Sequence, residues 1–142
     1  MSPFDQHETL AFQAAALARL LAIRLRDALV PLGLMPAQFS ALVEIGRAEG
    51  LTQKELVERL DVEQPGVART LNGLEADGWI ERRVRAGRSQ GLYLTQRSRM
   101  VLPRAAETAA RVNRDALAEL SRTERDLLLD QIDELVSGLK TG

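Results

Sequence analysis

The 142-residue sequence contains no cysteine, a single histidine and few aromatic residues. Without cysteine, the chain cannot form disulfides, thiolate metal sites or thiol redox sensors. Because only 4% of the residues are aromatic, leucine, alanine and valine must build the core, and that composition favours helices. No apolar run approaches the roughly 18 residues that a membrane-spanning helix needs, and the N-terminus shows no secretory signal. We therefore expect a cytoplasmic protein.

Residues that carry catalytic chemistry are also scarce. The only histidine, His7, lies close to the N-terminus, where we expect an ordinary surface residue. The sequence shows no phosphate-binding glycine loop, no nucleophile elbow and no cluster of metal ligands. We therefore expect no enzymatic activity, no metal site and no cofactor.

The charges are unevenly distributed, although the formal net charge is only −1. Residues 80–104 hold seven arginines against one acidic residue, a net charge of +6. Residues 115–142 hold seven acidic residues against three basic ones, a net charge of −4. This asymmetry indicates one anion-facing surface and a separate supporting part.

The first third of the chain predicts two helices. Apolar residues recur at helical spacing over 8–30, and Pro31 and Gly33 then break the pattern. Pro36 stands where a second helix would begin, and Gly50 is placed to cap its end.

The middle of the chain predicts a helix-turn-helix. Thr52 and Glu55 form a capping box at the start of a short helix, and residues 61–63 make a tight connection. A further helix over 64–77 buries Val67, Leu71 and Leu74, with Gly78 just after its end. Two short helices joined by about three residues are the signature of this motif.

A β-hairpin and two more helices follow. Residues 79–84 and 92–95 have strand character around a basic, glycine-containing loop over 85–91, which predicts a wing. Long helices are expected over 96–119 and 122–139, the second of which opens on a capping box at Ser121. The predicted fold is mainly α with a small β-hairpin wing. It comprises an N-terminal dimerisation helix (1–34), a winged helix-turn-helix domain (35–96) and C-terminal dimerisation helices (97–142).

The exposed face of the 64–77 helix carries side chains that suit base readout in the DNA major groove. Gln64 and Asn72 could pair with adenine, and Arg69 with guanine or a phosphate, while small residues would allow close approach. The predicted contact residues of this helix are Gln64, Pro65, Gly66, Ala68, Arg69 and Asn72.

The arginines of the wing extend this predicted DNA surface. Arg85 and Arg88 lie at the tip, where an arginine can enter the electronegative minor groove. Arg82, Arg83 and Arg97 could hold flanking phosphates, which sets register without reading sequence.

The long outer helices carry more apolar residues than a small helix-turn-helix module needs. We expect them to pack against a second subunit, because two-fold DNA-binding proteins need such a part to space their reading helices by about 34 Å. A monomeric bundle closed by the same helices is the alternative.

In combination, the motifs resemble those of the MarR family of regulators over nearly the whole chain. The segments that carry the resemblance are 35–39, 51–56, 67–71, 74–82 and 92–95. The resemblance implies a homodimer that binds an inverted-repeat operator, often as a repressor released by a small phenolic or anionic ligand. It matches Arg88 with the family's wing arginine. The aspartate common two residues earlier is replaced here by Ala86. The recognition helix opens with Glu63-Gln64-Pro65-Gly66, a turn in which family members more often have serine or threonine.

The ligand and the mode of action stay open at this stage. Phe12, Arg19 and Phe39 are candidates to line a ligand cleft, although phenylalanines at such helical positions also suit a plain core. A winged-helix protein-protein module, or a regulator that needs no effector, are alternatives to a ligand-responsive repressor. Steep salt dependence of duplex binding would separate DNA binding from protein contact.

Overall fold

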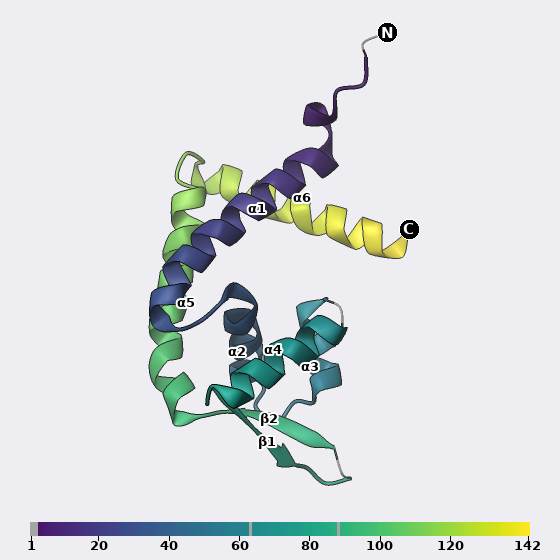
Figure 1. Cartoon of the computed structure of the whole chain (residues 1–142). Helices are drawn as coiled ribbons and strands as arrows, with labels where there is room; N and C mark the ends of the chain where they lie inside the picture. Colours follow the sequence, from purple (N-terminus) through teal and green to yellow (C-terminus); the bar gives the residue numbers. More distant parts are fainter. Residues whose placement is uncertain (1–2, 63, 88) are drawn as a thin grey trace.

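The computed structural model describes residues 3–62, 64–87 and 89–142. Figure 1 shows two parts: a lower part of short helices with a hairpin, and an upper part of long helices. This arrangement confirms the predicted fold, mainly helical with one small hairpin. In chain order, the helices and strands are α1 (Leu10–Leu29), α2 (Pro36–Arg47), α3 (Gln53–Leu60), α4 (Gln64–Ala76), β1 (Ile80–Val84), β2 (Gln90–Leu94), α5 (Gln96–Ala116) and α6 (Arg122–Thr141), with short 3-10 turns at Gln6–Glu8 and Val30–Leu32.

Local capping chemistry sets most helix boundaries. The hydroxyls of Thr52 and Ser121 accept the backbone N–H of Glu55 and Glu124, as expected for N-caps. The box at Ser121 is complete, because Glu124 accepts the Ser121 N–H at 2.9 Å. At Thr52 the box differs from the prediction, since the Glu55 carboxylate bonds the Thr52 hydroxyl instead of the backbone N–H.

The expectation that Gly50 caps α2 is wrong. The helix ends at Arg47 with Ala48 as its C-cap, and Gly50 lies beyond it with φ +95°. Its N–H donates to the carbonyl of Leu92, and the Leu92 N–H donates to the carbonyl of Leu51. The 50–51 segment thus runs along the outer side of β2. Gly91 allows this close approach, because a Cβ there would lie 2.8 Å from the Gly50 oxygen.

One hydrophobic core holds α2, α3, α4 and the hairpin together. Leu42 and Ile45 of α2 are fully buried, as is Leu56 of α3. The predicted core face of α4 is confirmed, because Val67, Leu71 and Leu74 are all buried. A stable lower part therefore presents the opposite face of α4 to solvent.

The hairpin joins this core to the long helices. β1 and β2 pair antiparallel, with Ile80 opposite Leu94 and Val84 opposite Gln90. Trp79 is buried just before β1, and its carbonyl accepts the backbone N–H of Thr95 and the hydroxyl of the buried Ser98 in α5. The base of the wing is thereby fixed to the first turn of α5.

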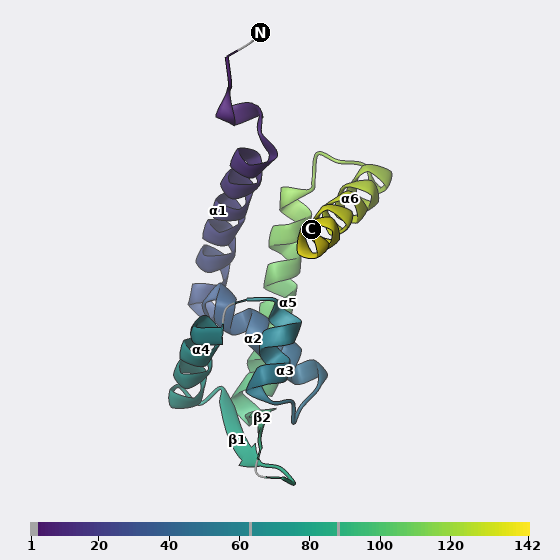
Figure 2. The same ribbon diagram turned by 90° about the vertical axis from the view of Figure 1, so that its right-hand side faces the viewer.

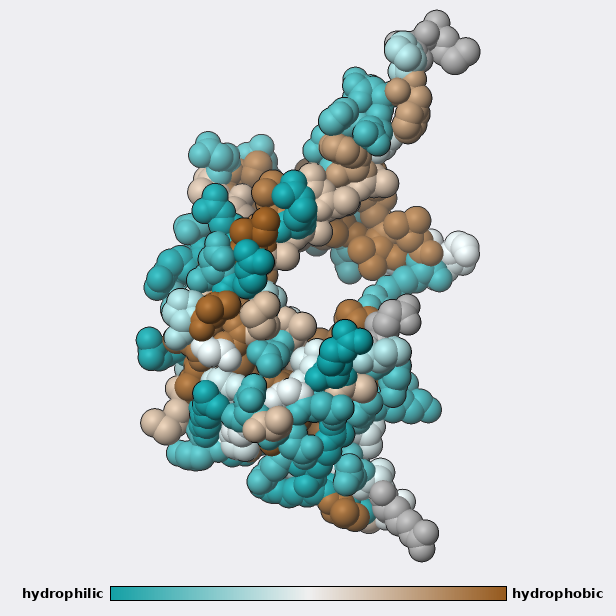
Figure 3. Space-filling model, viewed as in Figure 1, coloured by the Kyte–Doolittle hydropathy of each residue, from teal (hydrophilic) through white to brown (hydrophobic). Residues whose placement is uncertain are grey.

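The upper part consists of α1 packed along α5, with α6 projecting from the end of α5 on the side of α3 (Figures 1 and 2). No residue of α6 is buried, although Ile132, Leu135 and Leu139 form an apolar stripe at helical spacing. Figure 3 shows apolar side chains gathered on the projecting helix and along α1. These helices thus leave a large hydrophobic surface uncovered in a single chain.

None of the helices in the described parts of the chain could cross a membrane by itself. Only the stretch Leu10–Leu32 taken together with Pro36–Arg47, across a bend of 73°, reaches the required length and apolarity. The second of these helices buries Ala41, Leu42 and Ile45 in the core.

Candidate nucleic-acid interface

The outer face of α4 is the centre of the candidate interface. Gln64, Pro65, Gly66, Arg69 and Asn72 are exposed, and Ala68 is partly exposed. The helix is therefore amphipathic in the way the sequence predicted. Its exposed row combines an amide, an arginine and a second amide on one side of a firmly packed helix. Such side chains can donate to and accept from base edges in a major groove.

Arg82, predicted to contact a phosphate, lies instead between α3, α4 and β1. Its side chain is only 17% exposed. Nη1 donates to Gln53 Oε1 at 3.3 Å, and Nη2 donates to Asn72 Oδ1 at 3.1 Å. Nε lies 3.4 Å from Glu75 Oε1 in an ion pair. All three guanidinium nitrogens are engaged within the protein, so the geometry does not support a phosphate contact by Arg82.

Two wing arginines, Arg83 and Arg85, pair with carboxylates of the protein. Arg83 lies 4.3 Å from the centre of the Tyr93 ring and pairs with Glu81. The hydrogen bond to Glu81 raises the pKa of Arg83, so this residue stays cationic. Arg85 opens the loop at the end of β1, and its Nη1 lies 3.5 Å from Glu55 Oε1 of α3. The prediction that both contact DNA stays a prediction.

Glu55 links the wing to the first helix of the motif. Its hydrogen bond with the Thr52 hydroxyl is the main reason that its pKa is lowered, and Arg85 adds a smaller electrostatic contribution. The carboxylate is exposed, so its pairing with Arg85 is easily exchanged for another anion. Arg85 can therefore turn from Glu55 to a phosphate at little cost.

The two arginines at the start of α5 are engaged by the protein. Arg97 stacks on Trp79 at 4.0 Å and donates to the Asp77 carbonyl at 2.5 Å. Arg99 donates to the Leu94 carbonyl and to Glu49, at 2.9 and 2.7 Å. These contacts anchor α5 to the hairpin. A phosphate contact by Arg97, which the sequence predicted, would have to form alongside them.

Two sequence positions of interest lie outside the described residues: Arg88, the predicted minor-groove arginine, and Glu63 in the turn before α4. Ala86, where the resemblance implies an aspartate, is exposed in the turn at the wing tip. Gly87 beside it has φ +85°, which suits a tight hairpin turn.

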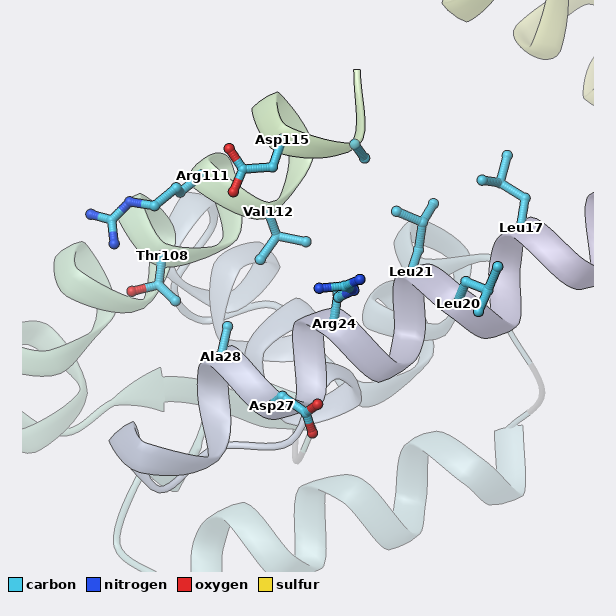
Figure 4. A pocket seen from close by; sticks show the side chains of 11 residues that line it. Leu17, Leu20, Leu21, Arg24, Asp27, Ala28, Thr108, Arg111, Val112 and Asp115 are labelled. Atoms are coloured by element: carbon cyan, nitrogen blue, oxygen red, sulfur yellow. The ribbon is translucent and has the colours of Figure 1, made fainter. Parts of the chain in front are cut away.

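A separate groove of about 730 Å³ lies between α1 and α5. Figure 4 shows Leu21, Arg24 and Ala28 of α1 opposite Thr108 and Val112 of α5. The full lining comprises Leu17, Leu20, Leu21, Arg24, Asp27, Ala28, Thr108, Arg111, Val112, Asp115 and Ala116. Its floor is apolar, and its charged groups are two arginines and two aspartates.

The residues predicted for a ligand cleft do not line this groove. Phe12 lies in the first turns of α1 with its ring 4.4 Å from that of His7. Arg19 is exposed further along α1, and Phe39 packs against the core from α2. The structure therefore offers Arg24 and Arg111 where the sequence suggested Arg19.

Sequence reasoning missed the residues that hold the arginines. Gln53 and Glu75 fix Arg82, and Glu49 fixes Arg99. The sequence did hold a signal that Asn72 and Glu75 could contact the same partner, because they are three residues apart and thus share a face of α4. For Gln53 and Glu49 the partners lie 29 and 50 residues away in sequence, and no local pattern marks them.

Comparison with known proteins agrees with this geometry. A model of the MarR family matches residues 32–89. The HTH-type transcriptional regulator YwoH of Bacillus subtilis is 33% identical over 94% of this chain and 89% of its own length. The chain belongs to the MarR family. It is therefore a winged-helix transcriptional regulator by family.

Two solved structures of transcriptional regulators resemble this chain. The repressor CouR, in a structure bound to a 23-mer DNA duplex, is 28% identical, with a TM-score of 0.83 over 95% of this chain and 99% of CouR. The MarR-family protein Rv2887 of Mycobacterium tuberculosis, in complex with salicylic acid, is 26% identical, with a TM-score of 0.70 over 89% of this chain and 96% of Rv2887. The winged-helix fold of this MarR-family chain thus recurs in a DNA-bound and in a ligand-bound relative.

Proposed function

We propose that this protein is a homodimeric repressor that binds an inverted-repeat DNA operator and releases it when a small phenolic or anionic ligand binds. The observation that carries the proposal is α4. Its apolar face is locked into the core, while Gln64, Arg69 and Asn72 lie on the solvent side, next to a basic wing. The similarity to DNA-bound CouR supports the same use of the helix here.

The uncovered apolar surface supports the proposed dimer. On α6, Ile132, Leu135 and Leu139 are 41%, 47% and 79% exposed, and α1 exposes Leu17 and Leu20. Isolated exposed leucines are common, but contiguous apolar stripes of this kind mark an interface. A second copy of the chain would cover them and place two α4 helices on successive major grooves, about 34 Å apart.

The groove between α1 and α5 is the proposed effector site. An aromatic ring would lie on its apolar floor at Leu21 and Val112, and a carboxylate would pair with Arg24. Because two aspartates offset the two arginines, a ligand with one carboxylate suits this groove better than a polyanion. Salicylate, the ligand of Rv2887, has this chemistry.

A selection from random DNA duplexes tests the proposed function. The purified protein should enrich a sequence with two inverted half-sites whose centres lie one helical turn, about 10 to 10.5 base pairs, apart. Recovery of unrelated sequences without symmetry would contradict it and would favour the alternative use of the winged helix as a protein-contact module.

The effector part needs a separate test with salicylate as the probe. Millimolar salicylate should weaken binding of the selected duplex by wild-type protein, and Arg24→Met should remove this effect. Arg114→Met is the matched control, because Arg114 lies on α5 outside the groove and pairs with Glu107. Equal salicylate sensitivity of the wild type and of Arg24→Met would contradict the proposed site.

A further inference from the structure

The side chain of Arg82 connects three elements that meet behind the DNA-facing surface. Figure 2 shows α3, α4 and β1 converging at the lower part of the molecule, with Arg82 on β1. Its guanidinium contacts Gln53 at the first turn of α3, and Asn72 and Glu75 on α4. Arg82 of strand β1 thus contacts Asn72, a side chain on the helix that we propose reads the DNA bases.

The chemistry of this contact fixes which way the Asn72 amide faces. The oxygen and nitrogen of an amide have nearly the same shape, so its orientation is decided by its hydrogen-bond partners. Arginine carries only donors, so only the oxygen of Asn72 can face it. The amide nitrogen therefore points away from Arg82, and in the described part of the chain it donates to no other group.

We propose that Arg82 is a positioning residue that locks Asn72 as a hydrogen-bond donor toward the major groove. This inference rests on the proposed DNA binding and assigns the readout of one side chain. Adenine recognition through both atoms of an amide needs the oxygen to accept from the adenine N6 group. Here the charge-assisted bond from Arg82 takes one of the two acceptor positions of that oxygen and holds the amide in one orientation, which disfavours the turn that pairing through both atoms needs. Asn72 thus donates to N7, which adenine and guanine share.

This changes the expectation for Asn72 that the sequence alone gave. A fixed donor does not separate adenine from guanine, because both offer N7; among the pyrimidines it disfavours cytosine, whose groove edge only donates, but not thymine, whose O4 accepts. Because every guanidinium nitrogen of Arg82 is engaged within the protein, Arg82 acts on base choice and not through a phosphate. Loss of Arg82 should therefore change specificity while leaving the salt dependence of binding intact.

The test compares purines at one position of the selected operator, the position whose preference disappears in Asn72→Ala. The wild type should bind duplexes with adenine or guanine there within about threefold of each other. In Arg82→Met the amide is free to turn, so preference for adenine over guanine should rise to about tenfold, with an unchanged salt slope. Arg114→Met, which removes an arginine of α5 outside the predicted DNA surface, is the matched control and should retain the wild-type ratio.

Two outcomes would overturn the inference. One is a wild type that already prefers adenine by tenfold, with the same preference in Arg82→Met. The other is a uniform loss of affinity in Arg82→Met together with a salt slope reduced by about one, which marks a phosphate contact.

A measurement on the DNA-free wild type separates this inference from the proposed function and does not depend on a variant that folds. In nuclear magnetic resonance spectra, a hydrogen bond from the Arg82 guanidinium to the Asn72 side chain should restrict the motion of both groups. Freely rotating side chains would overturn the positioning role even if the protein binds its operator. Absence of any selected operator, with restricted side chains, would overturn the proposed function and the donor role that rests on it.

Discussion

Replacement of Glu49 by glutamine should loosen the wing from the rest of the molecule. Glu49 follows α2, and one carboxylate oxygen accepts the backbone N–H of Leu94 at 2.9 Å and a guanidinium N–H of Arg99 at 2.7 Å. This one side chain therefore links the end of α2, strand β2 and helix α5.

The expected loss can be worked out from these two contacts. Hydrogen bonds to charged groups contribute about 1.5–3 kcal/mol, and neutral ones about 0.5–1.5 kcal/mol. A glutamine oxygen can still accept the Leu94 N–H, so the substitution weakens the contribution of this hydrogen bond to stability by about 1 kcal/mol without removing it. The Arg99 pair is partly exposed, with side chains 46% and 32% accessible, so it adds only about 0.5 kcal/mol. For a chain of this size, a total near 1.5 kcal/mol lowers Tm by roughly 3–6 °C.

The pH dependence gives a second signature. Burial acts to raise the pKa of Glu49, but the hydrogen bond from Leu94 and the contact with Arg99 outweigh it, so the pKa lies below its ordinary value of 4.5. A carboxyl with a lowered pKa stabilises the folded state above its unfolded pKa. That stabilisation is lost as the pH falls through the folded pKa. The difference in the free energy of unfolding between wild type and Glu49→Gln should therefore have its full value at pH 7 and be smaller at about pH 3.5.

Thermal unfolding at a fixed protein concentration, at pH 7 and pH 3.5, measures both effects. Glu119→Gln is the matched control, because the Glu119 carboxylate is exposed and forms no ion pair within the described residues. It should change the free energy of unfolding by less than about 0.5 kcal/mol. A Glu49→Gln protein as stable as the wild type at pH 7, or an equal deficit at both pH values, would refute the reasoning.

Three further predictions follow from the packing. Leu71→Ala removes a fully buried side chain of α4 and should cost about 2–5 kcal/mol in urea unfolding, whereas Arg69→Ala on the opposite face should change stability little but weaken binding of the selected duplex. Ser121→Ala removes the N-cap of α6 and should cost about 1 kcal/mol by the same measurement; no change would contradict the capping role. Ile132→Asp should convert dimers to monomers in sedimentation experiments, while Gln131→Asp adds the same charge beside the stripe and should remain dimeric; a dimeric Ile132→Asp would place the interface elsewhere.

Helix periodicity and capping chemistry made most of the fold predictable. Val67, Leu71 and Leu74 lie on one face of α4 by spacing alone, and all three are buried. Thr52 and Ser121 marked two helix starts correctly, because an N-cap depends only on residues within one turn. The prediction that Gly50 caps α2 was wrong, because the backbone conformation of Gly50 serves a contact with β2 and not the end of α2.

The candidate site was predictable in position but not in detail. The exposed row on α4 follows from the same periodicity that gives its core. The roles of Arg82, Arg85 and Arg99 do not follow from periodicity, since each of them has a partner that is distant in sequence. Arg82 looked like a surface cation, yet Gln53 and Asn72 enclose it once β1 folds against α3 and α4. The ligand groove likewise arises only when α1 and α5 pack together, which places Arg24 and Arg111 along the same groove.

Salt-titrated binding tests the central claim, DNA recognition by α4 and the wing, most directly. The protein is titrated with its selected duplex and with a scrambled duplex of equal length, from about 50 to 200 mM salt. The account predicts tighter binding to the selected duplex, and affinity that falls steeply and linearly on a logarithmic salt scale as phosphate contacts are lost. Equal affinity for both duplexes, or binding that salt leaves unchanged, would contradict it.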